Sequence, residues 1–94
     1  MFEEQERIQQ NLKIIRGYLT KTFPGYEMTE DTSDPRICHR FTMTRLKTYE
    51  QFKLKVGWPR LSDNSNTPDK TRRSLEHGDV AGKMRDVNGQ YFYW

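Results

Sequence analysis

The chain has 94 residues and a formal net charge of +3, with 33% hydrophobic and 31% charged residues. This length fits one domain covering residues 1–94, and its core has to rely on aromatic residues, which make up 13% of the chain. A single cysteine, Cys38, excludes an internal disulfide and a cysteine-based metal cluster.

The first six residues are acidic and polar, which is the reverse of a secretory signal. The longest apolar run, residues 91–94, is far shorter than the roughly 20 residues that cross a bilayer. We therefore expect a cytoplasmic protein without a membrane partner.

The first predicted element is a helix over residues 3–22. Its apolar face recurs at helical spacing through Ile8, Leu12, Ile15 and Leu19. Pro24 and Gly25 end the helix, and residues 26–31 are then predicted as a short strand.

Residues 37–58 predict an antiparallel hairpin, because apolar and polar residues alternate along both arms. The residue numbers of opposite positions add up to 95 in every pair. A register shift of one residue would expose the apolar side chains of one strand to water. The turn is either Lys47-Thr48 or a loop over residues 46–49, and the longer loop fits these residue types better. The inward face collects Ile37, His39, Phe41, Met43, Phe52, Leu54, Val56 and Trp58.

Residues 60–79 form a polar tract, which we expect to be loosely ordered and mobile. Within it, Thr67 as N-cap, Pro68 at the first position and Gly78 as the stop predict a helix ending at His77. Asn88-Gly89 is a strong hairpin-turn signal, so residues 83–87 either pair with residues 90–94 or form an irregular first arm.

Together these elements predict an α+β fold of order α-β-β-β-α-(β)-β, with an antiparallel sheet packed against the N-terminal helix. At the level of topology this order resembles double-stranded-RNA-binding domains and the small ribonuclease toxins that share their fold. The sequence carries neither family's motifs, so membership of neither is inferred.

Residues with catalytic potential have simpler structural explanations. His39 falls on the inward face of the hairpin, and His77 falls at a helix end, where it suits the dipole. Cys38 falls on the basic face, as an inert small residue. We predict no catalytic residues, no metal site and no cofactor, and lean against an enzyme.

The outward face of the hairpin is basic, and more cations follow it in the polar tract. Cations, hydroxyls and helix N-termini are the groups that contact phosphates. A solvated sheet face explains the same residues. The predicted surface also lacks aromatic side chains between its cations, on which the bases of a single strand would stack. The tentative nucleic-acid-binding set is Arg40, Lys53, Lys55, Arg60, Lys70, Arg72 and Arg73.

The aromatic C-terminus offers a second surface. One face of this strand is expected to pack under the first helix. The other face packs on a loop or on the second helix, or it forms a tentative partner interface, which includes a weak homodimer. Its residues are Tyr91, Phe92, Tyr93 and Trp94. The sequence thus predicts a small non-catalytic nucleic-acid-binding module, with a protein-interaction or regulatory module as the alternative. A metal-independent ribonuclease using His39 or His77 is the weaker alternative.

Overall fold

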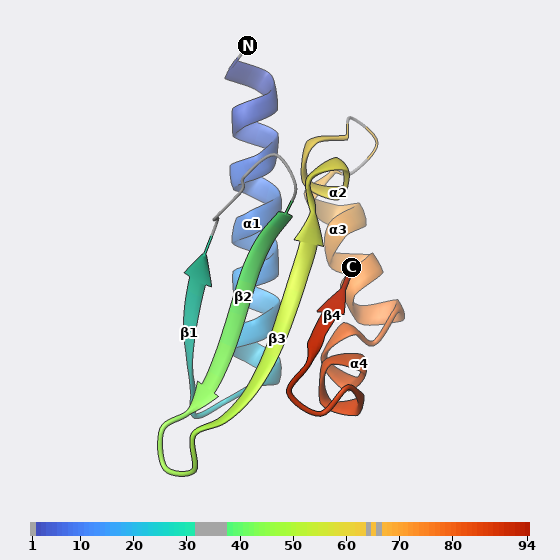
Figure 1. The fold of residues 1–94 in the computed structure, drawn as a ribbon. Helices are drawn as coiled ribbons and strands as arrows, with labels where there is room; N and C mark the ends of the chain where they lie inside the picture. The colour runs from blue at the N-terminus through green and yellow to red at the C-terminus, as the bar shows by residue number, and fades with distance from the viewer. Residues whose placement is uncertain (1, 32–37, 64, 66) are drawn as a thin grey trace.

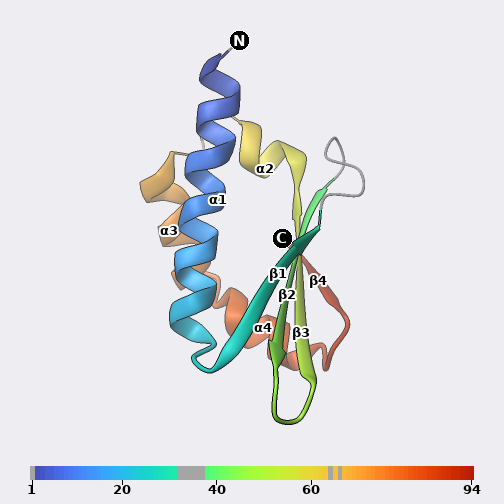
Figure 2. The same ribbon diagram turned by 90° about the vertical axis from the view of Figure 1, so that its left-hand side faces the viewer.

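A computed structural model describes residues 2–31, 38–63, 65 and 67–94, with side chains from residue 5 onward. The sheet has four strands. Figures 1 and 2 show the helices gathered on one face of it and no described helix on the other. The α+β class is therefore confirmed. The elements are α1 (Phe2–Thr22), β1 (Tyr26–Asp31), β2 (Cys38–Arg45), β3 (Glu50–Gly57), α2 (Trp58–Ser62), α3 (Pro68–His77), α4 (Val80–Asp86) and β4 (Tyr91–Tyr93).

Helix α1 and strand β1 follow the sequence pattern closely. The four α1 residues of the predicted apolar face are all buried against the sheet and the other helices. Gly25 adopts a φ of +82°, which turns the chain from the helix into β1. None of the helices in the described residues is long and apolar enough to cross a membrane.

The β2–β3 hairpin has the predicted register. Phe41 lies opposite Leu54 and Met43 opposite Phe52, and the four-residue loop closes between Arg45 and Glu50. The inward side chains of Phe41, Met43, Leu54 and Val56 are essentially inaccessible to solvent. The predicted partnership of Ile37 with Trp58 lies outside the described residues, because Ile37 is not among them.

Trp58 begins α2 and is not a strand residue, so the end of the predicted hairpin is wrong by one position. The reason is Pro59, which has no N–H for a sheet ladder but suits the first turn of a helix.

Helix α3 has the predicted ends, with the Thr67 hydroxyl accepting from the Lys70 N–H and Gly78 as the C-cap. It is anchored by Leu75, as expected, and by a buried polar link that the sequence pattern did not reveal. The Thr71 hydroxyl donates to Asn11 Oδ1 at 2.8 Å, and Asn11 Nδ2 donates to the Leu61 carbonyl at 3.0 Å. Asn11 therefore joins α1, α2 and α3 inside the core.

The predicted hairpin over residues 83–94 is wrong. Residues 80–86 form α4, with Val80, Ala81 and Met84 buried at helical spacing. Asn88 and Gly89 do take positive φ values of 51° and 86°, but they lead from α4 into β4. Strand β4 then pairs in parallel with β3, so the sheet is mixed, in the order β1-β2-β3-β4. The three helices α2–α4 provide the long crossover that a parallel pair needs.

We expect Asn11→Ala to lower the free energy of unfolding by about 3 kcal/mol, because it leaves the Thr71 hydroxyl and the Leu61 carbonyl buried without this partner. Thr71→Val removes one hydrogen bond, so about 1 kcal/mol is expected. Urea denaturation measures both, and the double variant should cost less than the sum. A cost below about 1 kcal/mol for Asn11→Ala would contradict the role of this link.

Candidate nucleic-acid interface

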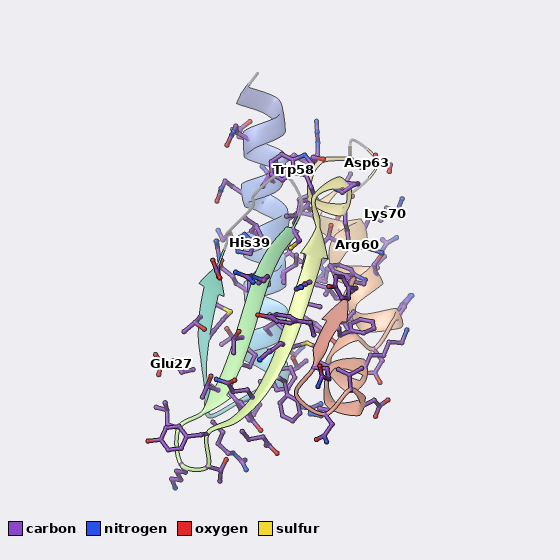
Figure 3. All side chains as sticks on the ribbon, viewed as in Figure 1. Glu27, His39, Trp58, Arg60, Asp63 and Lys70 are labelled. Carbon is purple, nitrogen blue, oxygen red and sulfur yellow. The ribbon has the colours of Figure 1, made fainter. Side chains whose placement is uncertain are left out.

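The sheet face that is turned away from the helices carries the outward side chains of the strands, and Figure 3 shows this face toward the viewer. Each strand contributes alternate residues, and the pairing fixes which ones are neighbours. Thr42 lies opposite Lys53 and Arg40 opposite Lys55, while Lys53 lies beside Tyr91 and Lys55 beside Tyr93. This outer sheet face comprises Glu27, Thr29, Asp31, Arg40, Thr42, Thr44, Gln51, Lys53, Lys55, Tyr91 and Tyr93.

The parallel pairing of β4 brings two aromatic rings between the cations. Lys53 Nζ lies 5.2 Å from the Tyr91 ring centroid, and Lys55 Nζ lies 4.6 Å from the same centroid. Lys55 Nζ is also 4.9 Å from the Tyr93 centroid and donates to the Tyr93 hydroxyl at 2.9 Å. That hydrogen bond is the main cause of a raised Lys55 pKa, so the ammonium stays charged at neutral pH.

The charge of the outer sheet face changes sign from one edge to the other. Edge strand β1 carries Glu27 and Asp31, whereas β3 carries Lys53 and Lys55. Arg40 lies between them and forms an ion pair with Asp31, so much of its charge is offset. Within the described residues the two lysines have no carboxylate partner. The positive potential is therefore strongest over β3 and β4.

Arg60 belongs to α2 and lies against Trp94, whose side chain packs toward the hydrophobic core. The Arg60 guanidinium carbon lies 4.1 Å from the Trp94 ring centroid, at the end of β4 (Figure 3). Burial lowers the pKa of Arg60, although arginine remains protonated in proteins at ordinary pH.

Lys70, Arg72 and Arg73 lie elsewhere. They belong to α3, which lies in the helical layer on the other side of the sheet (Figure 2). Arg72 is bonded to Asp69 at 2.7 Å. Of the seven cations selected from the sequence, the outer sheet face brings together Arg40, Lys53 and Lys55. Arg60 lies instead against Trp94, and the α3 residues lie in the helical layer.

The four aromatic residues at the C-terminus divide between the two sides of the sheet. Phe92 and Trp94 pack against the hydrophobic core, while Tyr91 and Tyr93 belong to the outer sheet face. Tyr93 is 70% exposed. The alternation of residues 91–94 in the sequence predicts this division. The sequence does not indicate that β3 is the neighbouring strand.

His39 lies on the inward side of β2, as its parity predicts, in a polar cluster with α1 and β1. Its Nε2 is 2.8 Å from Glu30 Oε1, and Arg16 donates to both Glu30 oxygens at 2.7 and 2.9 Å. The Arg16 hydrogen bond, with a smaller contribution from His39, holds the pKa of Glu30 below its usual range. This cluster ties α1 to the sheet.

The remaining residues of chemical interest show no such clustering. His77 lies exposed at the end of α3, and Cys38 is a free, half-buried thiol at the start of β2. Among the described side chains, no group of three or more His, Cys, Asp or Glu is placed to hold a metal ion.

No family model, curated protein or solved structure matches the chain.

We expect Glu30→Gln to destabilise the protein by about 1 kcal/mol at pH 7, as for a partly exposed ion pair. Since the folded pKa of Glu30 is lowered, its contribution is fully present above the unfolded value of about 4.3 and is lost as pH falls through the folded value. Thermal unfolding from pH 7 to pH 2 should show the two proteins converging in acid. Glu27→Gln, on the exposed outer face of the same strand, is the matched control. A difference that persists undiminished in acid would be inconsistent with this ion pair.

Proposed function

We propose that the protein is a non-catalytic module that binds single-stranded nucleic acid on the outer sheet face. Lys53 and Lys55 contact phosphates, and Tyr91 and Tyr93 stack with bases. The observation that carries the proposal is the pairing of each lysine with a tyrosine in the same row of the sheet. Cations that follow the backbone and aromatic rings that stack with bases are the two components of single-strand recognition.

The spacing of these rows supports a single strand over a duplex. Alternate residues of a strand lie about 6.6 Å apart, so Tyr91 and Tyr93 are separated by about that distance along β4. Successive bases in a duplex rise by only about 3.4 Å. A strand that places one base on each tyrosine must therefore be stretched and unstacked, which an unpaired strand can do at little cost.

The lysines that now rest on the tyrosine rings do not block this arrangement. A cation–π contact at an exposed site is worth about 0.5–1 kcal/mol, whereas stacking of a base on an aromatic ring is worth about 1–3 kcal/mol. A base can therefore displace an ammonium group from a ring. The displaced lysine remains beside the ring, where it can meet the adjoining phosphate.

A protein-interaction module remains the alternative, and the exposed Tyr93 favours it. Phe92 and Trp94 are used within the molecule, so a partner surface would consist of Tyr91 and Tyr93 on a strand of three residues. Homodimer formation stays a prediction, for which light scattering over a range of protein concentrations is the direct measurement.

We expect Tyr93→Ala to weaken binding of a fluorescein-labelled (dT)12 about tenfold, because one stacked base is lost. Tyr93→Phe keeps the ring and should bind as the wild type does, although it loses the hydroxyl that Lys55 contacts. Fluorescence anisotropy with (dT)12, (U)12 and a 12-base-pair duplex measures both variants. Equal binding by the alanine variant, or a preference for the duplex, would refute the proposal.

The lysines are tested by the salt dependence of the same binding. In Lys53→Gln/Lys55→Gln, the slope of log affinity against log salt should become shallower by about 1.4, at roughly 0.7 per phosphate contact. Lys13→Gln/Lys21→Gln is the matched control, because these exposed lysines lie on α1 in the helical layer. An unchanged slope in the first variant would exclude Lys53 and Lys55 from the interface.

Removing the partner of Arg40 should strengthen binding. Asp31→Asn releases the Arg40 guanidinium from its ion pair, so affinity for (dT)12 should rise about threefold and the salt slope should steepen by about 0.7. Asp69→Asn makes the same charge change and releases Arg72 on α3, away from the sheet. If both variants gain equally, the effect is one of net charge and the positioning of Arg40 is irrelevant.

A further inference from the structure

A groove lies between α1 and α3 in the helical layer. The Thr71 hydroxyl donates to Asn11 and the Ala81 N–H donates to the Tyr18 hydroxyl, so the chain advances in the same direction along both walls. The volume of the groove is about 570 Å³, within the range of about 300–1,000 Å³ for small-molecule sites. All of its lining residues belong to these two helices, so it shares no residue with the outer sheet face.

Gly17 leaves the groove open at its middle. It lies inside α1, where glycine is destabilising relative to alanine. Its φ is not among the positive values, and a Cβ built on it would meet nothing within 4 Å beyond its own helix backbone and chain neighbours. Neither the backbone nor the packing therefore requires a glycine here. The missing side chain keeps the floor of the groove accessible.

The floor of the groove is apolar and held in place. Ile14 and Tyr18 are half-buried, and both pack against the hydrophobic core. The Tyr18 hydroxyl also accepts the Ala81 N–H at 3.0 Å, which fixes the ring. Pro68, the first residue of α3, adds an apolar surface from the opposite wall. The site is thus formed without a ligand, as small-molecule sites usually are.

One end of the groove is cationic on both walls. Because Asn11 is bonded to Thr71, the following residues Lys13 and Arg72 come at similar levels on the two helices. Lys13 is exposed and has no carboxylate partner among the described residues. Arg72 is paired with Asp69, but an exposed ion pair contributes little and exchanges readily for another anion.

The negative charge of the lining lies further along. Glu76 follows Arg72 by about one turn on α3, which brings it to the level of Gly17. Lys21 lines the far end, beyond this carboxylate. The cations of the lining therefore outnumber its single carboxylate, and only the end at Lys13 and Arg72 has a cation on each wall.

We propose that this groove binds a small amphipathic organic anion. The apolar body of the ligand lies over Ile14, Gly17 and Tyr18. Its acidic head group lies between Lys13 and Arg72, where the guanidinium can donate two parallel hydrogen bonds to a carboxylate or sulfonate. The site is separate from the outer sheet face, so this inference does not depend on the proposed function.

The probe is 8-anilinonaphthalene-1-sulfonate (ANS), and N-phenyl-1-naphthylamine carries the same rings without the charge. Fluorescence titration of the folded full chain should show one saturable site for each dye. Lys13→Gln/Arg72→Gln should weaken ANS binding about fivefold and change binding of the neutral amine by less than about twofold. Lys70→Gln/Arg73→Gln makes the same charge change on exposed α3 residues outside the groove, and should bind both dyes as the wild type does.

Gly17→Leu tests the apolar part of the site. Leucine favours a helix over glycine, so the variant should unfold at or above the wild-type temperature while binding both dyes at least about tenfold more weakly. Thr20→Leu is the matched control, because it adds the same side chain to an exposed position of α1 outside the groove.

The site is located by ¹⁵N–¹H NMR of the full chain, in which ANS should move the amide signals of Ile14, Gly17 and Glu76. Several results would overturn the proposal: no saturable binding, signals that move at Lys53 and Tyr93 instead, or unchanged ANS affinity in Gly17→Leu. Equal loss of the two dyes in Lys13→Gln/Arg72→Gln would overturn the choice of an anion. Groove signals that move with protein concentration alone would assign the groove to a second copy of the chain, and so would also contradict it.

Discussion

Two backbone hydrogen bonds tie Trp94 to β3: its N–H donates to the Lys55 carbonyl at 2.8 Å, and its carbonyl accepts from the Gly57 N–H at 3.1 Å. They hold β4 in parallel beside β3, and both faces of the sheet depend on that pairing. On the inner face Phe92 lies beside Leu54 and packs against the core. On the outer face Tyr91 and Tyr93 come to lie beside Lys53 and Lys55. One short strand thus completes the core and the candidate interface together.

The charges on the outer face give that interface a direction. A sheet surface carrying lysine and threonine is ordinarily explained by solubility, and several scattered cations would remain so explained. Here the cations without a carboxylate partner among the described residues are those beside the tyrosines, whereas Arg40 is paired with Asp31. The same few residues therefore combine charge, aromatic stacking surface and regular spacing. This coincidence is the reason for proposing a binding surface here in place of an ordinary solvated face.

Local chemistry was sufficient to predict much of the fold. The helical spacing of Ile8 to Leu19, the parity of the hairpin and the caps at Thr67 and Gly78 each act over a few residues, and each was located correctly. The prediction for residues 80–94 was wrong because the local sequence signals there fit more than one structure. Asn88 and Gly89 do have the positive φ that a tight hairpin needs, but the same values serve the end of a helix.

The cationic half of the candidate interface followed from hairpin parity alone. Its aromatic half did not, because pairing between Lys53 and Tyr91 spans the whole crossover, and periodicity says nothing about which strand will be the neighbour. For the same reason, nothing local showed that α3 would carry its cations to the other layer.

The long crossover also orders events during synthesis. The hairpin and its lysines can form on a nascent chain well before residues 91–93 exist, because a hairpin closes locally. Until β4 has been made and docks, Lys53 and Lys55 of the growing chain have no tyrosine rings beside them. A chain truncated before residue 90 would keep Lys53 and Lys55 without neighbouring tyrosine rings. Because Tyr91 and Tyr93 lie beyond the crossover, the proposed interface can be assembled only after β4 has been made.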